Sequence, residues 1–285
     1  MGGLSPHIYR EAAHMDPRWP LDHIHLVVRD LDISLQFYRD ILGFEAKDLG
    51  DGVCLSPPMG GRCIIYLDHG ALFADKENYI YHLAILVPSR AVLGSILEKI
   101  LKIWDRIEGY ADHLVSEALY LRDPDNIGVE IYSDRDRKAW VRDEKGFIAM
   151  DTLPLDIEDL IIHGRRSGVE PRVTQDTIVG HIHLRGSSPE AAGRFYTEVL
   201  GMRITGIWFG ARFLAYEDYH HHVAVNNWPI PRPIEGSGLR SFALRRKGLL
   251  ERVALKGVPR EAAELVCGAS TVIRDPNGFL VEIME

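Results

Sequence analysis

The chain has 285 residues and a formal net charge of −8, and 46% of its residues are apolar while 26% are charged. This size allows two domains with buried cores, and without a lysine- or arginine-rich run the chain lacks the basic surface that nucleic acid requires. No apolar stretch has the length of a membrane span, and residues 1–20 lack the apolar core of a signal peptide. We therefore expect a cytoplasmic protein that acts on a small molecule and binds neither nucleic acid nor membrane.

The cysteines predict packing side chains. There are three of them, Cys54, Cys63 and Cys267, and no pair has the CxxC spacing of a zinc or redox site. An odd number of cysteines in a chain expected in the cytoplasm argues against a disulfide framework. We predict packing thiols at all three positions.

The first half of the sequence predicts two strand–helix units. Residues 22–44 (DHIHLVVRDLDISLQFYRDILGF) begin with a strand-like run, after which Asp32 can cap a helix that ends at Gly43 in a left-handed conformation. Residues 81–100 repeat the order of strand and helix. Residues 122–132 (RDPDNIGVEIY) predict a tight turn and a closing strand.

The second half of the sequence repeats the first. Residues 180–202 (GHIHLRGSSPEAAGRFYTEVLGM) align without a gap on residues 22–44, and residues 274–284 (RDPNGFLVEIM) align on residues 122–132. Pro189 stands near the first turn of the second predicted helix, a position that proline favours. The chain is therefore a duplication, with two units of strand, helix and further strands in each half.

The duplication also predicts the domain boundaries. A polar segment with one short predicted helix, at residues 156–163, separates the two halves and is typical of a linker that packs across both domains. The predicted parts are an N-terminal extension at 1–20, a first domain at 21–142, a linker at 143–178 and a second domain at 179–285.

Histidines and glutamates recur at matched points of both halves. In each half one histidine begins the first strand, another begins a strand of the next unit, and a glutamate lies on the last strand. The two sets are His23, His82 and Glu130, and His181, His222 and Glu282. Two imidazoles and one carboxylate form the ligand set of non-haem iron(II) and leave coordination positions open. A single such residue is more often a hydrogen-bonded strand residue than a ligand, but the recurrence favours a metal.

Together these motifs resemble the vicinal oxygen chelate superfamily, which includes glyoxalase I, fosfomycin and bleomycin resistance proteins and type I extradiol ring-cleaving dioxygenases. The resemblance covers about residues 20–285. It is carried by DHIHLVV with FYRDILGF, YHLAIL, DHLVSEALYLRDPDNIGVEIY, GHIHL with FYTEVLG, HHHVAV and RDPNGFLVEI. The arrangement looks most like that of the two-domain catechol 2,3-dioxygenase-like proteins.

This resemblance implies an α+β fold of two tandem domains, each made of paired βαβββ modules that form a half-open barrel around a metal site. It implies that the two sets of histidines and glutamate are the metal ligands, with His222 as the ligand of the HHHVAV strand. The implied cofactor is iron(II), with manganese(II) left open, and the implied partners are a small aromatic substrate and O2. The oligomeric state is left open, a homo-oligomer included.

The resemblance also implies a tyrosine three residues before the aspartate of the DPxx turn and a histidine on the loop before that strand. The first half has Tyr120 and His113 at these places, whereas the second half has Val272 and no such histidine. A further catalytic histidine is missing from the stretch GIWFGARFLAYED, which leaves the general base open. His221, beside the expected ligand, is the third catalytic candidate. We expect both halves to hold metal and the first half to carry the chemistry.

Two other functions are open at this point. A glyoxalase-type isomerase or lyase prefers a fourth protein ligand, for which Asp68 and Glu217 offer the carboxylates. A binding protein that sequesters an aromatic compound without turnover would use Trp208, Trp228 and Tyr219 as pocket walls. The resemblance to extradiol dioxygenases favours ring cleavage over both.

Overall fold

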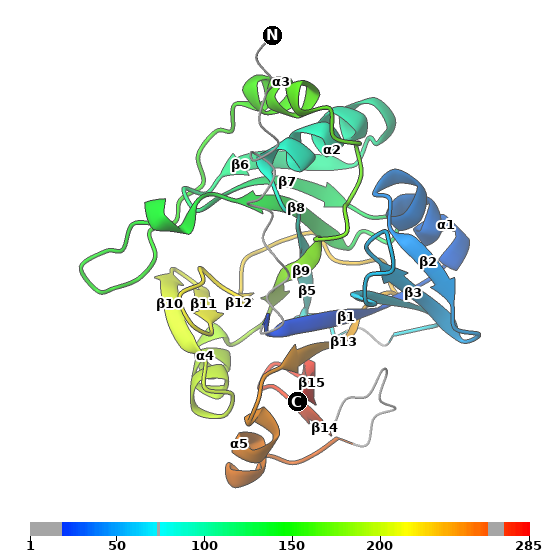
Figure 1. Ribbon diagram of the computed structural model, residues 1–285. Coiled ribbons are helices and arrows are strands. Elements are labelled where there is room, and N and C mark those ends of the chain that lie inside the picture. Colours follow the sequence, from blue (N-terminus) through cyan, green and yellow to red (C-terminus); the bar gives the residue numbers. More distant parts are fainter. Residues whose placement is uncertain (1–18, 73–74, 262–270) are drawn as a thin grey trace.

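The computed structural model of the chain describes residues 19–72, 75–261 and 271–285. Four modules, each with a leading strand, a helix and further strands, lie in two mixed sheets (Figure 1). The first module contains β1 (Leu21–Val28), α1 (Leu31–Leu35), a π-helical turn (Gln36–Ile41), β2 (Glu45–Asp48), β3 (Gly52–Ser56) and β4 (Ile65–His69). The second contains β5 (Tyr79–Leu86), α2 (Arg90–Ile103), β6 (Ile107–Asp112), β7 (Ser116–Arg122) and β8 (Gly128–Asp134).

The linker between the halves contains a 3-10 turn (Arg137–Ala139) and α3 (Ile157–Ser167). The third module contains β9 (Ile178–Arg185), α4 (Pro189–Glu198), β10 (Arg203–Trp208), β11 (Ala211–Ala215) and β12 (Val223–Asn226). The fourth contains β13 (Gly238–Arg245), α5 (Leu249–Leu255), β14 (Thr271–Arg274) and β15 (Leu280–Met284). The predicted α+β class with repeated modules is confirmed.

The modules pair across the two halves of the sequence rather than within them. One sheet has the order β10-β11-β12-β9-β5-β8-β7-β6 and joins the second module to the third. The other has the order β14-β15-β13-β1-β4-β3-β2 and joins the first module to the fourth. In Figure 1 the strands β9 and β5 lie side by side at the centre of the molecule. The expected pairing within residues 21–142 and within 179–285 is therefore wrong, although the duplication itself is clear.

The residues predicted to begin and end the helices are confirmed, with one correction. Gly43 has a φ of 91° and closes the first helical segment, as predicted. Pro189 stands at the start of α4, also as predicted. The N-cap of α1 is Asp30 rather than Asp32, because the Asp30 carboxylate accepts the N–H of Ile33.

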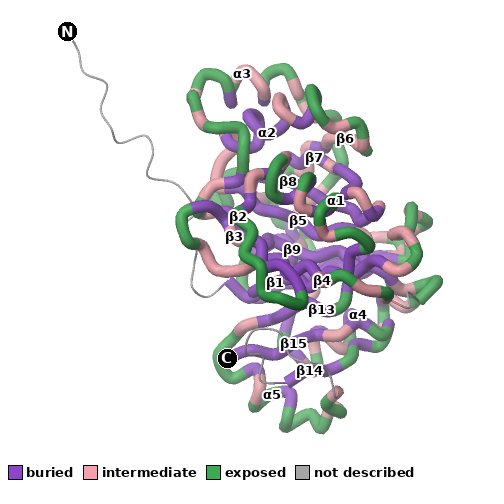
Figure 2. The backbone as a smooth tube through the Cα atoms, turned by 90° about the vertical axis from the view of Figure 1, so that its right-hand side faces the viewer, coloured by how far each residue is buried: buried purple, intermediate pink, exposed green. Residues whose placement is uncertain are grey.

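The core lies between the sheets and their covering helices. Figure 2 shows buried backbone along the neighbouring strands β1, β5 and β9, with exposure concentrated in the outer loops and helix surfaces. Within the described ranges, every helix is too short or too polar to cross a lipid bilayer.

The linker is anchored where α3 crosses α2. The predicted helix at 156–163 is present and continues to Ser167, with the Asp156 carboxylate accepting the N–H of Asp159 at its start. At the crossing Gly94 of α2 meets Gly164 of α3, and a Cβ at Gly94 would overlap the carbonyl oxygen of Leu160. After α3 the linker continues to β9, the first strand of the third module.

Replacing Gly94 by alanine is expected to lower the free energy of unfolding by about 1–3 kcal/mol, because the added methyl group must push the two helices apart. The matched control is Gly109→Ala on β6, where a Cβ meets no heavy atom within 4 Å. Urea titration of the two variants checks the prediction. Equal stability of both variants would show that the helix crossing is not close-packed.

The cysteine prediction needs correction. Cys54 on β3 and Cys63, just before β4, form a disulfide across neighbouring strands, with their Cα atoms 5.6 Å apart. These strands are adjacent and antiparallel, which brings the two side chains together although the sequence spacing does not signal it. Cys267 lies outside the described residues.

Candidate metal centre

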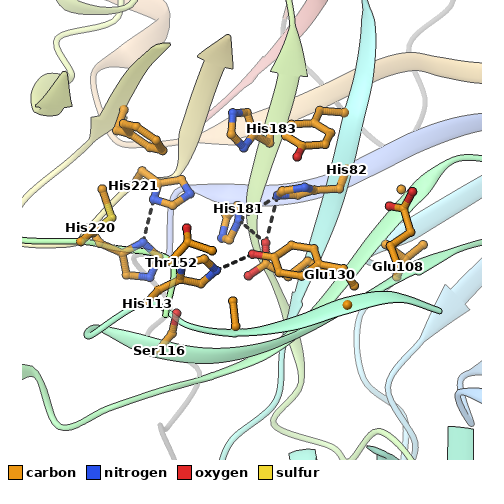
Figure 3. Close-up of a pocket in the computed structure, with 18 of the residues that line it drawn as sticks. His82, Glu108, His113, Ser116, Glu130, Thr152, His181, His183, His220 and His221 are labelled. Atoms are coloured by element: carbon orange, nitrogen blue, oxygen red, sulfur yellow. Dashed lines mark hydrogen bonds and ion pairs between the residues drawn. The ribbon is translucent and has the colours of Figure 1, made fainter. Parts of the chain in front are cut away.

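The register of three neighbouring strands places a histidine, an alanine and a glutamate in one row. His181 of β9 is opposite Ala84 of β5, and Ala84 is beside Glu130 of β8. His82 lies two residues before Ala84 and therefore projects from the same face of the sheet. The small side chain of Ala84 leaves space above it. The side chains of His82, Glu130 and His181 converge over that space (Figure 3).

The three side chains are within hydrogen-bonding or ion-pairing distance of one another. The Glu130 Oε2 atom lies 2.9 Å from His82 Nε2 and 3.1 Å from His181 Nε2, and the two Nε2 atoms are 3.3 Å apart. All three residues are at most 5% exposed. Two imidazole nitrogens that face each other at this distance can share one proton at most, whereas a divalent cation accepts both lone pairs together with the carboxylate. The donor set therefore fits a metal ion.

Burial controls the charge of the cluster. Burial lowers the pKa of His82 and of His181 below the ordinary value, outweighing the opposite effect of the Glu130 carboxylate. Burial also raises the pKa of Glu130, but contact with His181 and His82 outweighs it and holds the pKa well below its usual range. Neutral imidazoles and an ionised carboxylate are the forms that bind a metal.

The predicted ligand sets are regrouped by this fold. His82 and Glu130 of the first half lie together, but their third partner is His181 of the second half and not His23. His23 instead lies in the other sheet, where its Nε2 atom is 3.5 Å from the Glu282 carboxylate. Each expected set is thus divided between the two sheets, because the modules pair across the halves.

The sheet of the first and fourth modules has the same row of histidine, alanine and glutamate on three neighbouring strands, but a serine replaces the second histidine. His23 of β1 is opposite Ala243 of β13, and Ala243 is beside Glu282 of β15. The residue two positions before Ala243, which corresponds to His82, is Ser241, and its hydroxyl donates to Glu282. Asp22 also contacts the His23 ring at 3.0 Å. This second cluster therefore has one imidazole and one carboxylate at the matched positions.

The placement of His222 is the other departure from the sequence prediction. The HHHVAV segment leads into β12, the last strand of the third module, whereas the strand that matches β5 is β13. The His222 ring lies on the far side from the His82 cluster, where it stacks on Tyr219 and its Nδ1 accepts the N–H of Tyr216. His222 therefore lies outside the cluster of His82, Glu130 and His181.

His221, in contrast, faces the cluster of His82, Glu130 and His181. Its ring centroid is 4.2 Å from that of His181, and the side chains of His181, His220 and His221 form a second close trio, with ligand atoms within 4.8 Å of one another. Burial lowers the pKa of His221 well below its ordinary value, and the neighbouring His181 adds to this effect. A neutral imidazole thus stands beside the proposed coordination site.

A cavity of about 330 Å³ opens over the cluster. Its walls include aromatic and apolar side chains from the second and third modules and from the linker. They are Tyr81, Val115, Met150, Trp208, Phe213 and Trp228. Trp208 and Trp228, expected as pocket walls, therefore line this cavity, while Tyr219 lines a separate cavity beside His222.

Two further predicted residues meet at the edge of this cavity. The His113 Nε2 atom is 2.6 Å from the Tyr120 hydroxyl, and the His113 Nδ1 atom is 2.7 Å from the carbonyl oxygen of Asp151 in the linker. A carbonyl can only accept, so His113 Nδ1 carries the proton and a neutral His113 accepts the Tyr120 hydroxyl proton at Nε2. Burial raises the pKa of Tyr120 well above its ordinary value, which keeps the phenol protonated.

The sequence interpretation missed His183 and Asn226. The Asn226 side-chain amide donates to His183 Nε2 at 2.7 Å, and His183 lines the cavity beside His82. His183 alternates with His181 along β9, so period-two alternation was the available signal. The matching residue of the first half, His25, pairs with Asp68 at 2.6 Å in the other sheet.

Comparison with known proteins gives the same family. The model of the Glyoxalase/Bleomycin resistance protein/Dioxygenase superfamily matches residues 20–131 and 178–283. A catechol-2,3-dioxygenase of Bacillus subtilis (strain 168) is 38% identical over 236 residues, which cover 79% of this chain and 81% of that protein. The chain belongs to the Glyoxalase/Bleomycin resistance protein/Dioxygenase superfamily.

Solved structures share the fold at low sequence identity. A suspected dioxygenase from Bacillus subtilis subsp. subtilis str. 168 is similar with a TM-score of 0.65 and 14% identity, covering 93% of this chain and 84% of that one. Glyoxalase I from Zea mays is similar with a TM-score of 0.55 and 16% identity, covering 93% and 92%. Since both dioxygenases and glyoxalases occur among these relatives, the fold alone does not decide the reaction.

Proposed function

We propose that this protein is an iron(II)-dependent extradiol dioxygenase that cleaves a catechol-type aromatic ring with O2. The observation that carries the proposal is the convergence of His82, Glu130 and His181 at the base of an aromatic-lined cavity. Two imidazoles and one carboxylate with open positions are the ligand set of non-haem iron(II) oxygenases. The 38% identity to a catechol-2,3-dioxygenase supports the same reaction class.

The metal would be held by His82 Nε2, His181 Nε2 and Glu130, the atoms that converge in the structure. Bound iron(II) would supply a Lewis acid for the two vicinal oxygens of the substrate and the electrons that activate O2. Manganese(II) accepts the same ligands, so availability decides between the two metals.

His221 would accept the proton of a substrate hydroxyl. It lines the cavity next to His181, and its lowered pKa leaves it neutral and able to take up a proton. This assigns the general base to His221, the third catalytic candidate of the sequence analysis.

Tyr120 and His113 would act on the other side of the cavity. The Tyr120 ring lies 5.7 Å from that of His82, and its hydroxyl contacts His113. When His113 takes up a proton at Nε2, it becomes the donor to the Tyr120 oxygen, and the hydroxyl can then turn its own proton from His113 into the cavity. The pair is therefore suited to supply a proton after the ring opens.

The cavity walls suit a planar ring. Trp208, Phe213, Trp228 and Tyr81 offer aromatic surface, and the cavity volume of about 330 Å³ is in the range of small-ligand sites. The apolar walls would exclude water around the ring, while the polar side chains gather at the metal cluster.

Among the described residues, the carboxylates considered for a fourth ligand of the glyoxalase-type alternative are engaged elsewhere or lie away from the cluster. Asp68 pairs with His25 in the other sheet, and the Glu217 side chain is 63% exposed beside the separate cavity. Glu108 lines the main cavity, but its carboxylate is 2.8 Å from Arg122. We therefore place ring cleavage ahead of isomerisation.

Reconstitution tests the proposal directly. Metal-free protein is loaded with iron(II) without oxygen, mixed with catechol and then exposed to O2, and oxygen uptake is followed together with the yellow colour of the ring-opened product. We expect oxygen uptake and product to match one to one. Turnover of a methylglyoxal–thiol adduct without oxygen uptake, or tight binding of aromatics by metal-free protein without turnover under either metal, would contradict the proposal.

A further inference from the structure

A line of polar contacts leads from the metal-side cavity to a carboxylate that no step above uses. The Nδ1 atom of His221 is 2.8 Å from the Nδ1 atom of His220. The Nε2 atom of His220 is 3.3 Å from the Asp134 carboxylate at the end of β8. The contacts thus run Asp134–His220–His221, and Figure 3 shows the two histidine rings joined by a dashed line on the side of the cavity next to His181.

The carboxylate determines which nitrogens carry protons along this line. An ionised carboxylate can only accept, so a neutral His220 must carry its proton on Nε2 and offer a lone pair at Nδ1. The Nδ1 of His221 must then be the donor to His220. The lone pair of His221 is left on Nε2, which is the nitrogen available to the cavity.

The line of contacts is buried among aromatic side chains. His220 is 1% exposed and His221 is 8% exposed. The His220 ring packs against Tyr219 and Trp140, with ring centroids 4.0 Å and 5.3 Å away. The Asp134 side chain is 16% exposed and also accepts the Tyr219 hydroxyl at 3.2 Å. Arg137, 3.9 Å from Asp134, adds a positive charge beside the carboxylate.

We propose that Asp134 and His220 are positioning residues that fix the tautomer and orientation of His221, so that its Nε2 faces the substrate as a proton acceptor. The inference rests on the proposed function, in which His221 is the base. It also accounts for the run of three histidines. His221 meets the cavity, His220 connects it to Asp134, and His222 packs on the other side of the strand entrance.

The first test measures the tautomer without any turnover. Protein labelled with nitrogen-15 in histidine, loaded with zinc in place of iron, gives distinct signals for protonated and unprotonated ring nitrogens. His221 is assigned from the His221→Asn variant. We expect a protonated Nδ1 and an unprotonated Nε2 in the native chain, and a mixture or reversal in Asp134→Asn. A protonated Nε2 on His221 in the native chain would overturn the inference even if the protein is a dioxygenase.

The second test measures kinetics. Asp134→Asn is expected to lower kcat by about 10- to 100-fold, the range for partners that orient a functional histidine, with bound iron per chain unchanged. Tyr219→Phe is the matched control. It removes the Tyr219 hydroxyl, which also contacts Asp134, and leaves the contacts from Asp134 through His220 to His221 intact. We expect a kcat for Tyr219→Phe within about twofold of the native value, since the lost hydroxyl is not part of the Asp134–His220–His221 line.

The double variant separates positioning from general damage. When His221 is already replaced by asparagine, Asp134→Asn should lower kcat no further, because residues that act as one unit are not additive. An equal loss from Asp134→Asn with and without His221, an equal loss from Tyr219→Phe, or loss of bound iron in Asp134→Asn would each overturn the inference. If the native protein shows no oxygen uptake at all, the proposed function fails, and the tautomer measurement still decides the inference.

Discussion

Glu130→Gln is expected to abolish ring cleavage by removing the metal. The Glu130 carboxylate is the only anionic member of the His82–Glu130–His181 trio, and it is buried with both imidazoles within 3.1 Å. Glutamine has a similar shape without the charge. Because even outer-shell partners of metal ligands are worth about 10- to 100-fold in affinity, we expect iron affinity to fall by at least about 100-fold. Iron per chain after dialysis, with oxygen uptake in parallel, measures the effect.

Glu282→Gln is the matched control for this prediction. It makes the same chemical change at the same position of the other sheet, where Glu282 contacts His23 and Ser241. We expect iron content and kcat close to the native values and a lower free energy of unfolding, since a buried charge-assisted contact is weakened. Loss of iron from Glu282→Gln with retention in Glu130→Gln would show that the metal belongs to the sheet of the first and fourth modules.

His221→Asn is expected to lower kcat by about 100- to 10,000-fold, the range for removing a general base or acid. Iron binding should persist, because the trio of His82, Glu130 and His181 is untouched. The loss should appear in kcat and kcat/KM together, since the proton is taken in the transition state and substrate contacts to the metal remain. Steady-state oxygen uptake over a range of catechol concentrations measures both constants.

The adjacent residue provides a direct comparison. His222→Asn should leave kcat near the native value and lower the free energy of unfolding by about 1–3 kcal/mol, because the buried N–H of Tyr216 loses its acceptor. The sequence interpretation expects the opposite order, with His222 as a metal ligand. A loss of iron in His222→Asn, with full activity in His221→Asn, would restore that interpretation.

The sequence predicts which strand positions carry the candidate ligands, because the duplication repeats the same residue types at matched positions of both halves. His82, Glu130 and His181 were all recognised as candidate ligands from their matched places in the two halves. The pairing of modules could not be recognised in this way. Each leading strand is a similar apolar run. The motifs are the same whether β5 pairs with β9 and β1 with β13, as in the structure, or β1 pairs with β5 and β9 with β13, as expected. Only the tertiary packing decides which modules pair, and therefore which candidate ligands lie close together.

The error at His222 has a local cause. The segments HHHVAV and RSFALR both have an alanine two residues after a polar side chain, as YHLAIL does. Only the second of them is the leading strand of a module, and its polar residue is Ser241. Because histidine is a metal ligand and serine is not the expected one, the pattern favours HHHVAV, and with it the shorter strand β12, as the match. The three histidines precede β12, which begins at Val223, so the alternation of faces along that strand does not extend to them. His221 lines the cavity, whereas His222 packs against Tyr219.

The most direct test of the central claim, a metal centre shared by the two halves of the chain, is diffraction from crystals of the iron-loaded protein with data collected at the iron absorption edge. We predict an anomalous peak bounded by His82, Glu130 and His181, with each ligand atom about 2.0–2.3 Å away. A peak beside His23 and Glu282 or beside His222, with none at the predicted position, would contradict it.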